Sequence, residues 1–232
     1  MTNSRLFELT APSVVEGSNK LVADDAANHR AIAHDLYRDG YSIRHNALSP
    51  GLLELLVQTL NALSNNDFEA AGIGRAQDHT LDEQVRSDKI RWITGESAAG
   101  QAWLAWAEAL KVEINRRLFL GLFSFESHFA HYAPGDFYQR HSDAFRGQAN
   151  RTLSVVVYLN EQWREHEGGE LVLYRDEADP TGIKVLPEWG TVVAFLSEEF
   201  PHEVLPAVRD RYSIAGWFRI NTSSSTRVDP PA

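Results

Sequence analysis

The first half of the chain carries apolar residues at helical spacing. Three segments each show one apolar face, and we expect helices over residues 24–39, 50–60 and 101–118. End signals support the first two, because Gly40 can stop the first helix while Ser49 and Pro50 suit the cap and first turn of the second. The third helix has its inward face at Trp103, Ala107, Leu110 and Ile114.

The second half changes to short apolar or alternating runs separated by turn residues. We expect a strand in each such run, and in two similar runs among the helices: residues 41–44, 89–93, 122–131, 154–159, 169–174, 183–185, 191–196, 203–204 and 212–218. Helices followed by many short strands predict an α+β chain. Its core would be a double-stranded β-helix, or jelly roll, with a layer of N-terminal helices packed on one sheet.

These elements predict a single domain over residues 23–220, with a helical part (23–118) and a jelly-roll core (119–220). Residues 1–22 are weakly periodic and we expect an extended N-terminal arm. Residues 221–232 are rich in serine, threonine and proline, which is typical of a mobile tail. Residues 70–87 lack periodicity, so we expect a long loop or flexible hairpin there, and loops of this length are often functional.

Composition narrows the class of function. The absence of cysteine excludes disulfides, thiolate zinc sites and cysteine nucleophiles. A net charge of −10 makes a general nucleic-acid binder improbable, although Arg140, Arg146 and Arg151 predict a local positive rim. Neither a signal peptide nor an apolar run of membrane-spanning length is visible. We therefore expect a cytoplasmic monomer without nucleic-acid or membrane partners.

One short motif suits a metal site. Two histidines and one carboxylate can hold one face of an octahedral iron(II) and leave the opposite positions open. His141 and Asp143 are two residues apart, so in extended chain they would share a face about 7 Å apart, and His202 follows a strong predicted strand. By itself this spacing is common by chance, and for the two histidines taken alone ordinary surface residues are the favoured explanation.

Other histidines compete for this role. His128 and His131 form a second pair, but their spacing places them on opposite faces of a strand. The others lie in predicted helices or loops, where solvation or packing explains them better than metal binding: His29, His34, His45, His79 and His166.

An arginine and a tyrosine add an anion-binding element. Arg211 begins an apolar predicted strand, and an arginine entering a protein interior needs an anionic partner. Tyr158 shares a strand face with Ser154 and Val156 by alternation, and a phenol and a guanidinium can hold a carboxylate together. The plainer alternatives are a salt bridge from Arg211 to an acidic residue and an ordinary core tyrosine.

In their order and spacing, these residues resemble the iron(II)- and 2-oxoglutarate-dependent dioxygenases, specifically prolyl 4-hydroxylases of the hypoxia-inducible-factor type in a compact, bacterial-like form. The resemblance covers roughly residues 26–219. The segments that carry it are Tyr132-Ala133-Pro134-Gly135, Tyr138 to Asp143, Arg151 to Asn160, Gly168-Gly169-Glu170-Leu171, Pro201 to Pro206 and Arg211 to Trp217. Outside the iron motif, Arg86 to Gly95 is similar to the strand that follows the substrate-covering loop of those enzymes.

The resemblance implies a role for each matching residue. His141, Asp143 and His202 would bind Fe(II), and Arg211, counted with them as catalytic, would anchor 2-oxoglutarate. The other implied cosubstrate contacts are Tyr158, Tyr132, Val156, Leu171 and Trp217, and the implied substrate contacts are Arg151, Arg86, Asp88 and Trp92. Two departures stand out: Ala133 is inserted in a Tyr-Pro-Gly motif, and Ala215 replaces a hydroxyl-bearing residue.

The implied reaction is hydroxylation of a protein's prolyl residue at C4, with release of succinate and CO2 and with ascorbate as an accessory reductant. For compact bacterial members the resemblance points to a translation factor, elongation factor Tu, as the substrate. Two alternatives stay open: the same chemistry on a nucleic-acid base or small molecule, and a non-catalytic metal-binding recognition module.

Overall fold

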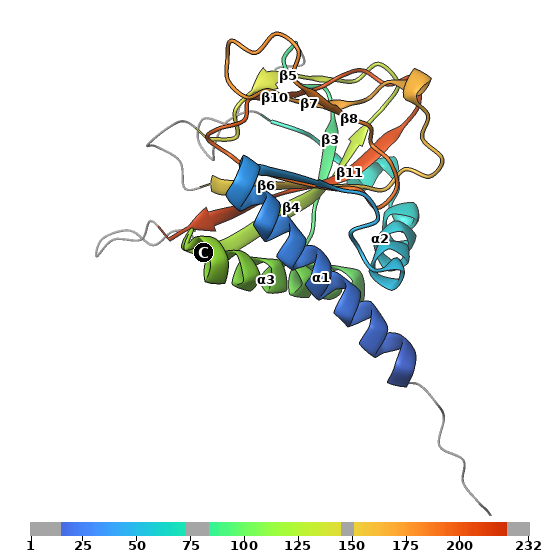
Figure 1. Cartoon of the computed structure of the whole chain (residues 1–232). Helices are drawn as coiled ribbons and strands as arrows, with labels where there is room; N and C mark the ends of the chain where they lie inside the picture. Colours follow the sequence, from blue (N-terminus) through green and yellow to red (C-terminus); the bar gives the residue numbers. More distant parts are fainter. Residues whose placement is uncertain (1–14, 73–83, 145–150, 222–232) are drawn as a thin grey trace, which may run out of the picture.

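The computed structural model describes residues 15–72, 84–144 and 151–221, and it omits the side chains of residues 15–24 (Figure 1). The described chain contains three α-helices: α1 (Val15–Asp39), α2 (Pro50–Ala62) and α3 (Ala98–Leu118). Two short 3-10 helices, η1 (Asn65–Asp67) and η3 (Glu165–Glu167), lie between other elements. No helix of the described chain is both long enough and apolar enough to cross a membrane.

The strands of the described residues form two antiparallel sheets. The larger sheet has the order β1-β9-β6-β11-β4-β3-β2 and the smaller sheet the order β5-β10-β7-β8. In chain order the strands are β1 (Tyr41–Arg44), β2 (Glu69–Ala70), β3 (Lys89–Trp92), β4 (Leu122–Tyr132), β5 (Tyr138–His141), β6 (Arg151–Tyr158), β7 (Leu171–Leu173), β8 (Ile183–Val185), β9 (Val192–Leu196), β10 (His202–Val204) and β11 (Arg211–Ile220). Figure 1 shows the smaller sheet above the larger one.

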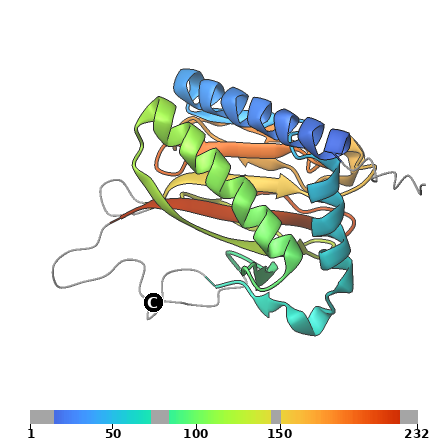
Figure 2. The ribbon, with the colours of Figure 1, turned by 90° about the horizontal axis from the view of Figure 1, so that it is seen from below.

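The helices cover the outer face of the larger sheet. Figure 2, seen from below, shows α1 and α3 next to each other in front of the strands, with α2 crossing at one end. One core cluster fills the space between helices and sheet, where Trp103 of α3 and Leu153, Val155 and Val157 of β6 are buried. The predicted jelly roll with a helical layer on one sheet is confirmed.

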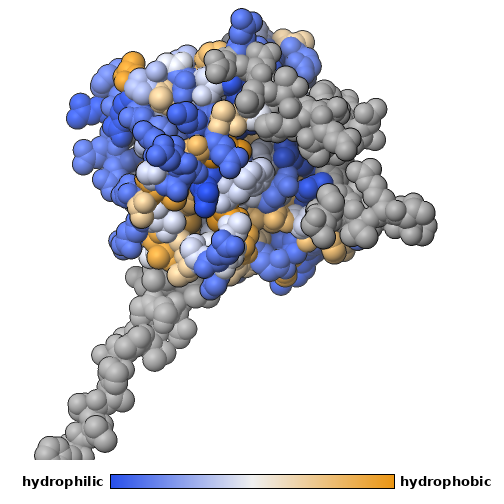
Figure 3. Space-filling view, turned by 180° about the vertical axis from the view of Figure 1, so that it is seen from behind, coloured by the Kyte–Doolittle hydropathy of each residue, from blue (hydrophilic) through white to orange (hydrophobic). Residues whose placement is uncertain are grey.

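A second cluster lies between the two sheets. Tyr158 and Val156 belong to it, together with Leu171 of β7 and Phe195 of β9. Successive β6 residues therefore face opposite clusters, as strand alternation requires. The predicted shared face of Ser154, Val156 and Tyr158 is the one that looks toward the smaller sheet. On the outer surface shown in Figure 3, hydrophilic side chains dominate and hydrophobic ones form small separate patches.

Several element boundaries differ from the predictions. Helix α1 begins at Val15, so the expected arm is helical over 15–22, because helix propagation adds one hydrogen bond per residue even where apolar periodicity is weak. Helix α3 begins at Ala98, where the Ser97 hydroxyl accepts a hydrogen bond from the Gly100 amide at 3.0 Å. Strand β5 was not predicted, because its sequence Tyr-Gln-Arg-His is too polar to show a buried face.

Other predictions fall partly outside the described residues. Of the expected loop 70–87, Ala70 belongs to β2, which pairs with β3, and residues 73–83 lie outside the described chain. Almost all of the expected tail, residues 222–232, also lies outside it. The division into arm, single domain and tail stays a prediction.

Candidate active site

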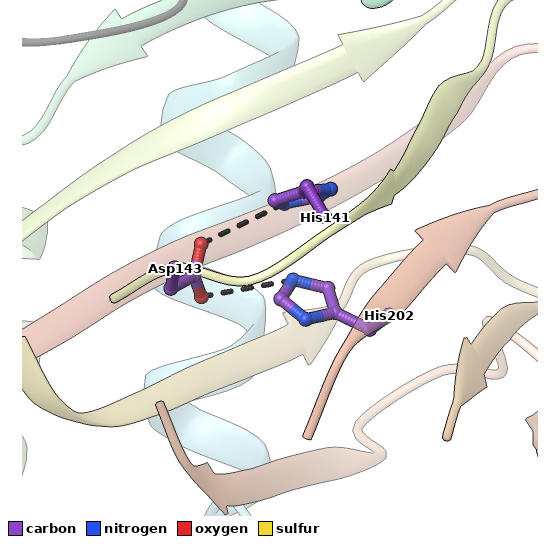
Figure 4. Close-up of side chains that lie close together, drawn as sticks. All are labelled: His141, Asp143 and His202. Atoms are coloured by element: carbon purple, nitrogen blue, oxygen red, sulfur yellow. Dashed lines mark ion pairs between the residues drawn. The ribbon is translucent and has the colours of Figure 1, made fainter. Parts of the chain in front are cut away.

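The two histidines and the aspartate meet where the smaller sheet faces the larger one. His141 ends β5 and His202 begins β10, and the two strands pair with these residues directly opposite each other. Asp143 follows two residues after His141. One ligand atom from each residue lies within 4.8 Å of the other two. The His141 Nε2 atom is 3.7 Å from Asp143 Oδ1, and His202 Nε2 is 3.6 Å from Asp143 Oδ2 (Figure 4).

The three side chains therefore converge as predicted, but the local backbone differs from the expected extended strand. Strand β5 ends at His141, so Asp143 lies in a bend beyond the strand rather than on its face. The bend places the carboxylate beside both imidazoles, within 3.7 Å of each Nε2 atom.

Backbone carbonyls orient both imidazoles. His141 Nδ1 is 2.8 Å from the Gln139 carbonyl oxygen, and His202 Nδ1 is 3.1 Å from that of Phe200. Because a carbonyl only accepts, each Nδ1 carries the proton and donates it. Each Nε2 is then left as a lone-pair donor on the side of Asp143, which is the arrangement that metal-binding histidines require.

The charges of the three residues suit a divalent cation. Burial, together with the nearby His141, lowers the pKa of His202 to about 4, so this imidazole is neutral near pH 7. Burial alone would raise the pKa of Asp143, but the two histidines and a hydrogen bond from Ser154 outweigh it and hold that pKa well below its usual range. One carboxylate and two imidazoles form a donor set typical of iron(II) in oxygenases.

The three residues line one pocket between the sheets. Most of the residues that were singled out from the sequence also line it: Arg86, Trp92, Tyr132, Arg151, Val156, Leu171, Arg211 and Trp217. Tyr158 and Asp88 do not line the pocket. Tyr158 is buried behind it beside Arg211, and Asp88 is buried beside Arg86, to which it is bonded.

Arg211 is a buried cation whose guanidinium contacts only neutral groups. It is the first residue of β11 and is 1% exposed. Its Nε donates to the Gly169 carbonyl at 2.9 Å and its Nη1 to Ser213 Oγ at 3.3 Å. No carboxylate of the described residues lies within ion-pair distance, so the structure does not support the salt-bridge alternative.

The tyrosine beside Arg211 also lacks a partner. The Tyr158 hydroxyl is buried and has no hydrogen-bond partner within the described part of the chain. Burial raises the pKa of Tyr158 to about 12, although Arg211 acts in the opposite direction, so the phenol stays protonated and able to donate. A buried cation without an anionic partner and a buried donor without an acceptor are costly unless a ligand pairs with them, and a carboxylate fits both.

The tight turn at Gly169 brings the backbone against Arg211. Gly169 has a φ of +74°, which L side chains rarely adopt, and a Cβ there would stand 3.3 Å from the Arg211 Cδ and 3.1 Å from the Trp163 ring. Glycine thus allows the Gly169 carbonyl to reach the guanidinium, which explains the Gly-Gly pair seen in the sequence.

One wall of the pocket is a row of contacting side chains in which Arg151 lies over Trp217 and the next two ring contacts are tilted and edge-on. The Arg151 guanidinium lies 3.9 Å from the centre of the Trp217 ring and is bonded to Glu126 at 2.8 Å. Trp217 is followed by His128 at 5.4 Å between ring centres, and His128 by Trp92 at 5.2 Å. Trp92 is 46% exposed, so this row of side chains runs from the buried pocket to the surface.

Arg86, which also lines the pocket, is held by an acidic partner and contacts an aromatic ring. Arg86 Nε donates to Asp88 Oδ1 and Arg86 Nη2 donates to Asp88 Oδ2 at 2.9 Å, and the guanidinium carbon lies 4.7 Å from the centre of the Tyr138 ring. The predicted positive rim is only partly found. Arg140 packs over Tyr174 and bonds to backbone oxygens of a neighbouring turn, and Arg146 lies outside the described residues.

Sequence reasoning missed some pocket residues. His128 was considered only as a competing ligand, yet it lines the pocket, and burial followed by the Arg86 charge lowers its pKa to about 3. Strand alternation along β4 could have found it, because Tyr132 and Ala130 line the same pocket. Ser154 and Ser213 also line it, but a lone serine on a strand carries no signal in the sequence.

Comparison with known proteins gives the same picture. Residues 127–219 match the family model of the 2OG-Fe(II) oxygenase superfamily. The crystal structure of a Pseudomonas putida prolyl-4-hydroxylase is 40% identical with a TM-score of 0.73, covering 83% of this chain and 98% of that chain. A Trichoplax adhaerens prolyl hydroxylase, solved with a peptide fragment of the hypoxia-inducible-factor oxygen degradation domain, is 28% identical with a TM-score of 0.74, covering 88% of this chain and 94% of that one.

Curated relatives match over a shorter part. Human Egl nine homolog 1 is 26% identical over 145 residues, which is 59% of this chain and 33% of the relative. The hypoxia-inducible factor prolyl hydroxylase of Caenorhabditis elegans is 26% identical over 146 residues, 20% of its length. The chain thus matches a third or less of these relatives. The bacterial match is high in identity and nearly complete in coverage, and the chain belongs to the 2OG-Fe(II) oxygenase superfamily, among its prolyl hydroxylases.

Proposed function

We propose that the chain hydroxylates C4 of a prolyl residue in a protein substrate, consuming 2-oxoglutarate and O2 and releasing succinate and CO2. The observation that carries this proposal is one pocket lined by both the histidine–aspartate cluster and Arg211, with the unpartnered Tyr158 hydroxyl of the described residues buried beside that arginine. The first has the donor set of an oxygenase iron and the second suits the far carboxylate of a dicarboxylic acid.

His141, Asp143 and His202 would hold Fe(II), which supplies O2 activation when it is bound. Arg211 and Tyr158 would hold the distal carboxylate of 2-oxoglutarate, with Tyr132 beside them because its ring centre lies 4.9 Å from the Arg211 guanidinium carbon. Val156, Leu171 and Trp217 would form apolar walls that exclude water from the reacting atoms.

The peptide would bind along the row of side chains from Arg151 to Trp92. A proline ring is apolar and packs well against aromatic rings, and Trp217 and Trp92 offer such rings from the pocket to its mouth. Arg151 and Arg86 are fixed by Glu126 and Asp88, so each presents its edge in a constant position to backbone carbonyls of a peptide. Asp88 thereby acts through Arg86 rather than by contact.

We propose both a substrate class, which is a protein, and one candidate protein. The 40% identity to a bacterial prolyl-4-hydroxylase supports a protein substrate, and elongation factor Tu is the candidate that we carry forward from the resemblance. A cytoplasmic location would bring the chain together with a translation factor. Ascorbate would serve as an accessory reductant that keeps the iron in its Fe(II) state.

The decisive experiment measures two products at once. Purified protein with Fe(II), 2-oxoglutarate and ascorbate is incubated with elongation factor Tu or with host lysate, succinate is quantified and new hydroxyproline is mapped by mass spectrometry. We expect substrate-stimulated succinate formation and the gain of one oxygen at a proline, both lost in His141→Ala and Asp143→Ala. Oxygen gain on a nucleic-acid base or a free amino acid instead would contradict the proposal.

A further inference from the structure

We propose that Ser154, itself held by Ser197, is a positioning residue that aims the Asp143 carboxylate at the metal site. This inference rests on the proposed function, because it assumes that Asp143 is a metal ligand. It adds two residues, one on β6 and one just after β9, which neither the family motif nor the resemblance singles out.

Asp143 needs such a support because no strand fixes it. Strand β5 ends at His141, and Asp143 lies in the bend that follows. A carboxylate on irregular backbone can rotate about its side-chain bonds unless something holds one oxygen, and metal-binding carboxylates are commonly held by such a hydrogen bond.

The bond is short and buried. Ser154 Oγ lies 2.6 Å from Asp143 Oδ2, and Ser154 is 2% exposed. Because an ionised carboxylate can only accept, the Ser154 hydroxyl must be the donor. The oxygen that it holds, Oδ2, is the one that faces His202, while Oδ1 faces His141. Fixing Oδ2 therefore fixes the plane of the carboxylate relative to both imidazoles.

Ser197 fixes the hydroxyl in turn. The two serine Oγ atoms are 2.9 Å apart and Ser197 is fully buried. The only proton on the Ser154 hydroxyl is directed at Asp143, so Ser197 must donate to Ser154. Both hydrogen bonds therefore have a fixed direction: Ser197 donates to Ser154, and Ser154 donates to Asp143. Hydrogen bonds in such a chain polarise one another, and the last one ends on a charged acceptor.

The chain of bonds also links the two sheets. Ser154 pairs with Phe195 in the larger sheet, and the Ser197 amide bonds to the Thr152 carbonyl at 3.1 Å in the same sheet. Asp143 follows β5, and His202 lies on β10, both of the smaller sheet. The two serines, which are held by the larger sheet, thus fix the Asp143 carboxylate, which follows a strand of the smaller sheet. Residues of both sheets therefore set the positions of the metal-binding side chains.

The test measures Mn(II) binding to metal-free protein by electron paramagnetic resonance, without turnover. We expect Ser154→Ala to weaken Mn(II) binding about 10- to 100-fold, the range typical of losing a hydrogen bond to a metal-binding side chain. Ser154→Thr, which keeps the hydroxyl and suits a strand, should keep most of the wild-type affinity for Mn(II). Ser197→Ala should weaken binding by a smaller factor, because Ser154 can still donate.

Ser42→Ala is the matched control. Ser42 is also 2% exposed on the larger sheet and donates to a carboxylate, Asp35 Oδ2, at 2.8 Å, but it lies on β1 and does not line the pocket. We expect it to lower the unfolding temperature without changing Mn(II) binding. If Ser154→Ala binds Mn(II) as wild type does, or if Ser42→Ala weakens binding equally, the positioning role is wrong.

The two proposals fail in different ways. If wild-type protein shows no Mn(II) site, or a site that Asp143→Ala leaves intact, the proposed function fails and this inference fails with it. If the site depends on Asp143 but not on Ser154, only this inference fails. Should Ser154→Ala not fold, as judged by thermal unfolding, Ser197→Ala decides, and unchanged Mn(II) binding in that variant overturns the relay.

Discussion

The guanidinium carbon of Arg211 lies 5.1 Å from the centre of the Tyr158 ring, and both side chains are buried. Within the described chain, neither the guanidinium nor the phenol meets an acidic group. The fold therefore maintains a cation and a phenolic donor side by side at its centre. Burying both groups is costly in the free protein, and the carboxylate of a bound ligand would offset that cost by pairing with both.

Arg211→Lys should weaken binding of 2-oxoglutarate. Lysine keeps the charge but loses the planar fork and the bond to the Gly169 carbonyl. Losing a hydrogen bond to a charged group costs about 1.5–3 kcal/mol, so we expect the KM for 2-oxoglutarate to rise about 10- to 100-fold. Succinate formation at varied 2-oxoglutarate measures this. Arg209→Lys, on the surface beside Trp163, is the control, and an unchanged KM in Arg211→Lys would remove the anchor assignment.

Tyr158→Phe should move stability and ligand affinity in opposite directions. The hydroxyl has no partner in the free protein, so its removal should raise the free energy of unfolding by about 1–3 kcal/mol. It should also weaken 2-oxoglutarate binding about tenfold, because the ligand loses a donor. Urea unfolding without ligand and calorimetric titration with Mn(II) present measure the two effects. A destabilised variant with unchanged affinity would mean that Tyr158 is an ordinary core residue.

Metal binding should stabilise the folded protein. At a free metal concentration 100 times the Kd, binding to the folded state alone adds about 2.7 kcal/mol. We expect Mn(II) to raise the unfolding temperature of wild type, and EDTA to reverse this. His202→Ala should abolish the shift, whereas His131→Ala should keep it, because His131 pairs with Asp210 away from the pocket. A shift that persists in His202→Ala would place the metal elsewhere.

Much of this architecture was predictable because it rests on local patterns. The inward face of α3 and the short strands of the jelly roll follow from side-chain periodicity, and the histidine–aspartate motif stands out by residue type. The parts that were not predictable depend on tertiary contacts. Strand β5 carries a polar sequence whose pairing is supplied by β10, and the bond from Ser154 to Asp143 joins residues of different sheets.

The environment of His29 also depends on a tertiary contact. From the sequence, this histidine could be either solvated or packed. It is 5% exposed on α1, and its ring centre lies 4.9 Å from that of Trp106 on α3. Burial lowers its pKa from 6.5 to about 4, against an opposing effect of Glu113. Between these two values the unfolded chain binds a proton that the folded chain does not. His29 thus favours folding fully above pH 6.5, and this contribution is lost as the pH falls toward 4.

His29→Phe should remove this dependence while it keeps the ring contact with Trp106. As the pH falls from 6.5 toward 4, the variant should gain stability relative to wild type by up to about 1.4 kcal/mol per pH unit. Urea unfolding at a series of pH values measures the difference. His34→Gln is the control, because the His34 side chain is 67% exposed on the same helix and should leave the slope unchanged. Parallel stability curves for wild type and His29→Phe would show that burial of His29 does not depress its pKa, because the groups that titrate elsewhere are the same in both proteins.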